Sequence, residues 1–242
     1  MTTAAAPADT QRLARLAGGL YLLVIIGGLL AEAVVRQRII VHGDAVTTAA
    51  NVLAHEQLYR WGFVADLLPL LCNMALALLF YEIFKTTDRR AAALVVVFTV
   101  AGSTIQGAAL LFHLGPLLLL KGVATLDGLT ASQLQALAYL SLRFQAHGYT
   151  LALVFFGCSC VTVGYLVLRS GLLPRFIGVL MVIAGLCYFL NSMAVFIAPG
   201  ASSVLFLLPC LAGEGALTAW LLFGRLRPRA ARASEVGAIV GA

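Results

Sequence analysis

Six apolar segments constrain the fold of this chain more than any other feature of its sequence. They cover residues 13–35, 61–84, 91–119, 145–168, 175–198 and 204–223. A transmembrane helix needs about 20 mostly apolar residues, and each of these segments supplies that length. The sequence therefore predicts an all-α fold, a polytopic helical membrane bundle with about six transmembrane helices.

The composition supports the same fold class. Of the 242 residues, 62% are hydrophobic and 11% are charged, and the mean hydropathy is +1.00. A soluble domain carries roughly 25% charged residues, so a single water-soluble core would not hide this much apolar surface. We expect a cytoplasmic N-terminal tail over 1–12, a single transmembrane domain over 13–223, and a basic, disordered cytoplasmic tail over 224–242.

The first apolar segment could also be a signal peptide, since Arg12 and Arg15 precede it and Ala31-Glu32-Ala33 resembles a cleavage site. Its apolar run is longer than the roughly 7–15 residues of a signal peptide, so we expect an uncleaved first span.

The distribution of basic residues sets the expected orientation. Eleven Lys and Arg residues lie on the side that holds both termini, and five lie on the other side. The positive-inside rule places both termini in the cytoplasm. We expect the chain to lie in the cell (inner) membrane. The net charge of +6 does not indicate a nucleic-acid partner, because the basic residues lie at the ends of the segments.

Two outer loops contain signals for short interfacial helices. Asp44 follows a turn and can cap a helix over Ala45–Leu58. Thr130 and Gln133 fit a capping box for a second helix. If that helix continues through 131–168, it is about 57 Å long, so its first turns must lie outside the membrane or it must bend near Gly148.

The sequence predicts no metal site and no cofactor. All five cysteines lie inside apolar segments, and Cys158 and Cys160 are two residues apart, which places them on different helix faces. We interpret them as packing residues without disulfides. The aromatic residues Tyr21 and Tyr188 are likewise interpreted as packing or lipid-facing residues.

Polar side chains inside the segments fall toward one membrane face, in the outer half of the spans. They are Glu32, Asp66, Asn73, Gln106, His113, His147, Asn191 and Glu214. Spacings of seven residues place Asp66 with Asn73, and Gln106 with His113, on common helix faces. Similar stripes combine Arg143 with His147 and Thr150, and Glu32 with Arg36. We expect these stripes to face the bundle interior, because a charge exposed to lipid at mid-span costs about 2.5–3.5 kcal/mol.

A structural explanation competes with a functional one for most of these residues. Residues at the outer ends can face water, and Asn73, Gln106 and Asn191 can hydrogen-bond between helices. Glu214 is harder to explain in this way. It lies near the middle of its segment between Gly213 and Gly215, which allow another helix to approach closely, and a carboxyl at that depth must be paired or protonated.

Several short motifs resemble a known bacterial membrane family. They are Gly43-Asp44-x-x-Thr47-x-x-Asn51, Arg60, Asp66, Phe155-Phe156-Gly157, Gly164-Tyr165-Leu166, Arg169-Ser170-Gly171, Leu173-Pro174-Arg175 and Glu214. Over about residues 13–223 the chain resembles the family called domain of unknown function 4386. The resemblance implies a multi-pass membrane protein and no particular activity. Similar members often carry His in place of Ser159 and Asp in place of Asn191, so this chain lacks two ionisable groups of that pattern.

Three functions fit these observations, and whether the protein is an enzyme stays open. The first is a site that binds or processes a membrane lipid or small amphipathic molecule. Its candidate acid/base residues are Asp66, Glu214, His113 and His147, and its candidate ligand-binding residues are Glu32, Arg36, Arg60, Asn73, Gln106, Arg143 and Asn191. The second is a transporter or proton-coupled channel, although little polar beyond Glu82 continues the pathway inward. The third is an accessory subunit of a membrane complex, and helix packing could also form a homo-oligomer.

Overall fold

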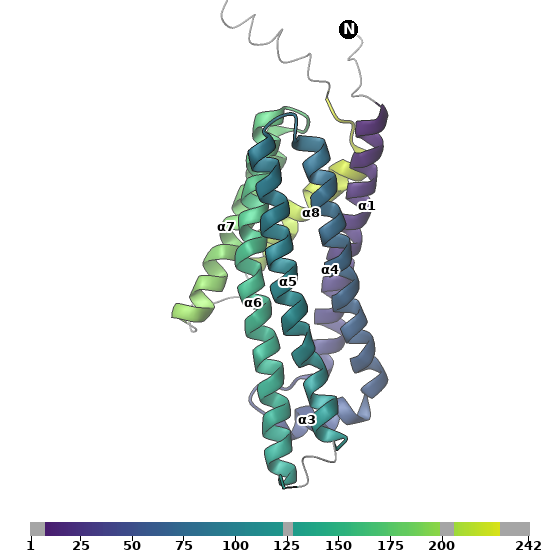
Figure 1. The fold of residues 1–242 in the computed structure, drawn as a ribbon, viewed down its shortest axis with the longest axis vertical. Helices are drawn as coiled ribbons and strands as arrows, with labels where there is room; N and C mark the ends of the chain where they lie inside the picture. The colour runs from purple at the N-terminus through teal and green to yellow at the C-terminus, as the bar shows by residue number, and fades with distance from the viewer. Residues whose placement is uncertain (1–7, 123–127, 199–205, 228–242) are drawn as a thin grey trace, which may run out of the picture. The chain divides into compact units, whose positions relative to one another are not determined.

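The structure is a computed structural model that describes residues 8–122, 128–198 and 206–227. In chain order, its regular elements are α1 (Ala8–Leu30), η1 (Ala31–Arg36), α2 (Gln37–Ile39), α3 (Ala45–Ala54), α4 (Glu56–Phe84), α5 (Arg89–Leu120), α6 (Ala131–Ser170), α7 (Arg175–Ile197) and α8 (Leu207–Phe223) (Figure 1). Every regular element in these ranges is helical, which confirms the predicted all-α class.

Five continuous helical stretches are long and apolar enough to cross a membrane. They are Asp9–Ile39, Glu56–Phe84, Arg89–Leu120, Ala131–Ser170 and Arg175–Ile197. The protein is therefore a multi-pass membrane protein. The sixth predicted segment, 204–223, corresponds to α8, which has 17 residues. That length is at the lower end of the roughly 17–25 residues found in spanning helices.

The first loop helix forms as the capping signal indicates, but it is shorter than predicted. The backbone N–H of Thr47 donates to the Asp44 carboxylate at 2.9 Å, which caps α3. The helix ends at Ala54 because His55 leaves the helical region at φ −117° and ψ 36°. Leu58 therefore belongs to α4, where it packs against the core instead of extending the loop helix.

The second loop helix also forms, and it continues into the following span without a break. The N–H of Thr130 donates to the side-chain oxygen of Gln133 at 2.8 Å, and the N–H of Gln133 donates to the Thr130 hydroxyl at 3.4 Å. This reciprocal pair is the predicted capping box. The resulting helix α6 has 40 residues, about 60 Å at 1.5 Å per residue, so it is longer than a bilayer core of about 30 Å.

The ends of the described chain are more ordered than the predicted tails. Helix α1 begins at Ala8, inside the segment expected to be an N-terminal tail. Gln11 accepts a hydrogen bond from the backbone N–H of Leu226 at 3.0 Å, and the Leu226 side chain is buried. The first residues after α8 are therefore packed, because Leu226 supplies an apolar anchor. The rest of the predicted basic tail, 228–242, lies outside the described residues.

The described chain divides into two compact units. One comprises the described residues of Met1–Leu22, Asn73–Ala101 and Leu153–Ala242, and the other comprises Leu23–Cys72 and Gly102–Ala152. We call them the terminal unit and the middle unit. The core of the middle unit contains Val35, Ile39, Val52, Tyr59, Leu117 and Leu142. In the terminal unit, α6 and α7 approach closely where Gly164 meets Gly178.

Candidate binding site

The site in the middle unit begins with a local irregularity in the first span. Between α1 and α2 the chain forms one wide turn, η1, in which the N–H of Gln37 bonds to the carbonyl of Glu32, five residues earlier. Such π-type turns occur mostly as single turns within α-helices and are frequent at functional sites. The turn presents Glu32 and Arg36 together, and their side chains form an ion pair at 3.2 Å.

Arg36 also forms an ion pair with α4. Its second terminal nitrogen lies 2.6 Å from Oδ2 of Asp66. The three charged side chains differ greatly in exposure, at 58% for Glu32, 23% for Arg36 and 6% for Asp66. One guanidinium thus connects an exposed carboxylate to a buried one, and the buried carboxylate has the charged partner that burial requires.

A cavity of about 200 Å³ adjoins this ion-pair chain. It is lined by Glu32, Arg36, Ile40, Asp66, Gln106, Ala109, Leu110, Leu142, Gln145, Ala146, Tyr149 and Thr150. The lining combines two carboxylates, one guanidinium, two amides and two hydroxyls with aliphatic side chains. Such a mixture suits a small molecule that has both a polar and an apolar part.

Three of the predicted ligand-binding residues, Glu32, Arg36 and Gln106, meet at this cavity, together with Asp66, a predicted acid/base residue. Sequence reasoning missed Gln145 and Tyr149, both from α6. The ring centroid of Tyr149 lies 5.9 Å from Cζ of Arg36, so the ring offers its face to the guanidinium.

Of the predicted stripe of Arg143, His147 and Thr150 on α6, Thr150 alone lines the cavity. The side chains of Arg143 and His147 are exposed, and neither lines the cavity. The buried face instead carries Ala138, Ser141 and Gln145, at spacings of three and four residues. The small residues on this face, Ala138 and Ser141, were the available signal, because they allow α5 to come near. The Ser141 hydroxyl donates to the carbonyl of Phe112 on α5 at 2.7 Å.

His113 is buried, but it belongs to the core rather than to the cavity wall. Its Nε2 lies 2.9 Å from the carbonyl of Tyr59, and the two rings stack with centroids 4.1 Å apart. The Tyr59 hydroxyl in turn donates to the carbonyl of His113 at 2.5 Å. A side-chain hydrogen bond joins His113 to Gln145, which does line the cavity. The imidazole therefore connects α5 to Tyr59 of α4 and positions Gln145 at the cavity wall.

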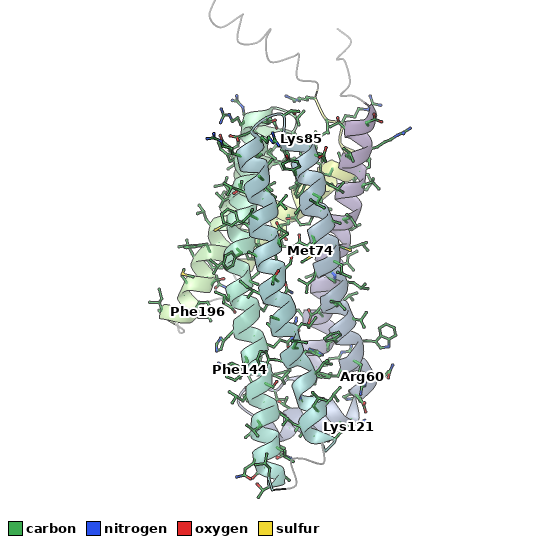
Figure 2. The ribbon with its side chains drawn as sticks, viewed as in Figure 1. Arg60, Met74, Lys85, Lys121, Phe144 and Phe196 are labelled. Atoms are coloured by element: carbon green, nitrogen blue, oxygen red, sulfur yellow. The ribbon has the colours of Figure 1, made fainter. Side chains whose placement is uncertain are left out.

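Arg60 lies outside the cavity as well. It is exposed on α4 and pairs with Glu56 at 2.9 Å, and Lys121 pairs with the same carboxylate at 2.5 Å. Figure 2 labels Arg60 and Lys121. This surface network accounts for the charge of Arg60 without a ligand.

Glu214 belongs to the terminal unit, where hydroxyl and thiol groups surround it. The side chains of Tyr21 and Tyr188 hydrogen-bond to it, and Sγ of Cys160 lies 3.7 Å from its Oε1. Among the described residues it takes part in no ion pair. The expected close approach of a helix holds at Gly213, where an added Cβ would lie 2.7 Å from the carbonyl oxygen of Leu180, whereas the equivalent position at Gly215 faces open space.

The remaining predicted residues, Asn73 on α4 and Asn191 on α7, are half-buried and also belong to the terminal unit. The prediction of one pocket shared by Asp66 and Glu214 stays a prediction, because these carboxyls lie in different units. In the described parts of the chain, no group of three or more His, Cys, Asp or Glu is arranged to hold a metal ion.

Residues 16–224 match the model of the family described as domain of unknown function DUF4386. The chain belongs to this family. No curated protein and no solved structure matches the chain. In this DUF4386 chain, the Ser159 hydroxyl is buried and lies 2.9 Å from that of Thr99.

Proposed function

We propose that this DUF4386 protein binds a lipid-like or small amphipathic molecule within the membrane, with the polar end of the ligand in the middle-unit cavity. The observation that carries the proposal is the Arg36–Asp66 ion pair, 2.6 Å long, at the wall of a cavity whose other walls are partly aliphatic. Charged groups inside a membrane segment are costly, and they mark functional sites by default.

The size of the cavity limits what it can hold. At about 200 Å³ it is smaller than the roughly 300–1,000 Å³ of typical pockets for drug-sized ligands. It suits a head group or a small polar molecule, and a longer apolar tail would have to lie in the bilayer.

The charges at the wall favour one kind of head group. Two carboxylates, Glu32 and Asp66, flank the single guanidinium of Arg36. An anion approaching Arg36 would meet both of them, whereas an amine or hydroxyl could donate to them and to the amide of Gln106. We therefore expect a ligand with a positive or hydrogen-bond-donating polar end.

The same geometry supports binding better than acid/base catalysis. Of the four candidate acid/base residues, only Asp66 lines the cavity. The Asp66 carboxylate is already engaged by the Arg36 guanidinium at 2.6 Å. Nε2 of His113 is engaged by the carbonyl of Tyr59.

We also propose that the protein lies in the cell membrane with both termini in the cytoplasm and the Arg36–Asp66 pair toward the outer face. The support is the excess of eleven basic residues over five on the side of the termini.

A set of amphiphiles with identical tails tests the proposed function. We would measure the binding of decylamine, decanol and decanoate to the purified protein by native mass spectrometry. Decylamine should bind at least about tenfold more tightly than decanoate, which corresponds to about 1.4 kcal/mol. Gln106→Leu should weaken decylamine binding several-fold, because it removes a cavity amide without breaking the ion pair.

Arg60→Gln is the matched control, since Arg60 lies on the same helix as Asp66 but outside the cavity, and it should bind like the wild type. Equal binding of all three amphiphiles, or no response to Gln106→Leu, would contradict the proposal. Transport of decylamine by the protein across the membrane of reconstituted vesicles would instead favour the transporter hypothesis.

A further inference from the structure

A second concave surface lies in the terminal unit, on the first and second spans. It is an apolar groove of about 500 Å³ lined by Arg15, Leu16, Gly19, Leu20, Ala75, Leu78 and Leu79. Gly19 on α1 and Ala75 on α4 contribute almost no side chain to it. A Cβ added at Gly19 would meet nothing within 4 Å, so the space above this glycine is open. The leucines form the rest of the apolar surface.

Positive charge lies at one end of this groove. Arg15, half-buried, is the only charged residue among the described residues that line it. Arg12 is three residues earlier on α1, so it lies on the same helix face, one turn nearer the helix end. Neither guanidinium takes part in an ion pair with another described residue, and the acidic residue nearest in sequence is Asp9, in the first turn of α1.

We propose that this groove binds one acyl chain of an anionic phospholipid, whose phosphate is held by Arg15 and Arg12. Long basic side chains keep their aliphatic stems along apolar surface and extend their charge toward the membrane interface. A guanidinium recognises phosphate through paired N–H donors. A single-chain apolar ligand has no group that could accept hydrogen bonds from these donors. The groove and the two unpaired guanidinium groups thus match the two halves of a phospholipid.

The proposed lipid site shares no lining residue with the middle-unit cavity and differs from it in charge. The cavity has two carboxylates beside one guanidinium, whereas the groove has a guanidinium and no carboxylate among its lining residues. We therefore expect the cavity to favour a positive or hydrogen-bond-donating head group and the groove a negative one, and one proposal can fail without the other.

The test is competition between two phospholipids with the same acyl chains. We would purify the protein in detergent with equal amounts of phosphatidylglycerol and phosphatidylcholine, and then count the retained lipids by native mass spectrometry. The wild type should retain phosphatidylglycerol at least about fivefold more than phosphatidylcholine. Arg12→Gln with Arg15→Gln should abolish this preference, whereas Arg89→Gln with Arg90→Gln, which removes two exposed charges outside the groove, should leave it unchanged.

A second arm fills the groove itself. Gly19→Leu should reduce the retained phosphatidylglycerol at least about fivefold, and Ala75→Leu should do the same from the opposite wall if the first variant does not fold. Gly28→Leu is the matched control, because Gly28 also lies on α1 and an added Cβ there also meets nothing within 4 Å. Equal losses in Gly19→Leu and Gly28→Leu, or equal retention of the two lipids by the wild type, would overturn the proposal. The proposal would also be overturned if the wild type formed a dimer and Gly19→Leu lost the dimer but kept its lipid. The groove would then be an interface between copies of the chain.

Discussion

The ion pair between Arg36 and Asp66 connects two helices of the middle unit and should stabilise them against each other. Asp66 is almost fully buried, and Arg36 keeps a second partner in Glu32. Removing one member of a fully buried pair costs about 3–5 kcal/mol, and removing an exposed pair costs about 0–1 kcal/mol. For Asp66→Leu we expect a loss of about 2 kcal/mol in the free energy of unfolding, measured by denaturant titration in detergent.

Glu32→Gln is the natural comparison, because it removes the exposed carboxylate from the same guanidinium. We expect a change below about 0.5 kcal/mol. If both substitutions have the same effect, the burial of Asp66 does not determine the strength of the network.

We expect the stability of the protein to depend on pH through Asp88, which lies in the turn before α5. Its pKa lies below its ordinary value, chiefly because the N–H of Ala91 hydrogen-bonds to the carboxylate, and also because Tyr165 and Arg169 contact it. The folded state therefore favours the ionised form. This contribution is present above the ordinary pKa of about 4 and is lost as the pH falls through the lower folded value.

We would measure unfolding midpoints of the wild type and Asp88→Asn between pH 7 and pH 3. The variant should be less stable at pH 7, and the difference should shrink below about pH 4. A difference that stays constant with pH would mean that the charge of Asp88 does not contribute.

At the scale of elements, glycines decide how closely α6 and α7 pack. A Cβ at Gly164 would lie 2.7 Å from the carbonyl oxygen of Gly178 and 2.9 Å from the backbone nitrogen of Val182. Backbone atoms cannot rotate away as a side chain can, so Gly164→Ala must separate the helices. We expect a loss of about 1–3 kcal/mol in thermal or denaturant unfolding.

Gly28→Ala makes the same chemical change where nothing lies within 4 Å. It should leave stability unchanged or raise it by up to about 1 kcal/mol, because alanine favours the helix. Similar destabilisation by both substitutions would show that helix packing at Gly164 is not the cause.

The helix α6 also shows why only part of the candidate site followed from the sequence. Its charged positions, Arg143 and His147, suggested an interior stripe, but its buried face carries Ser141 and Gln145. Periodicity identifies which residues share a helix face. It does not identify which face meets a neighbouring helix, because that depends on partners far away in the sequence.

At the scale of the whole molecule, whether the short helix α8 crosses the membrane decides on which side the C-terminus lies. Five long apolar helices alone would place the termini on opposite sides of the membrane, and a spanning α8 of 17 residues returns the C-terminus to the side of the N-terminus. We expect reporter fusions at both termini to be cytoplasmic. A C-terminal reporter active only outside the cytoplasm would show that α8 does not cross.

The sequence alone determined the all-α membrane class, the cap of α3 at Asp44 and the capping box of α6. These features depend on local composition and on residues within one or two helical turns. Tertiary structure decided that Arg36 meets Asp66, that Gln145 rather than His147 faces the cavity, and that Glu214 is surrounded by Tyr21, Tyr188 and Cys160. Each of these contacts joins residues from different helices, and only the packing of complete helices brings such residues together.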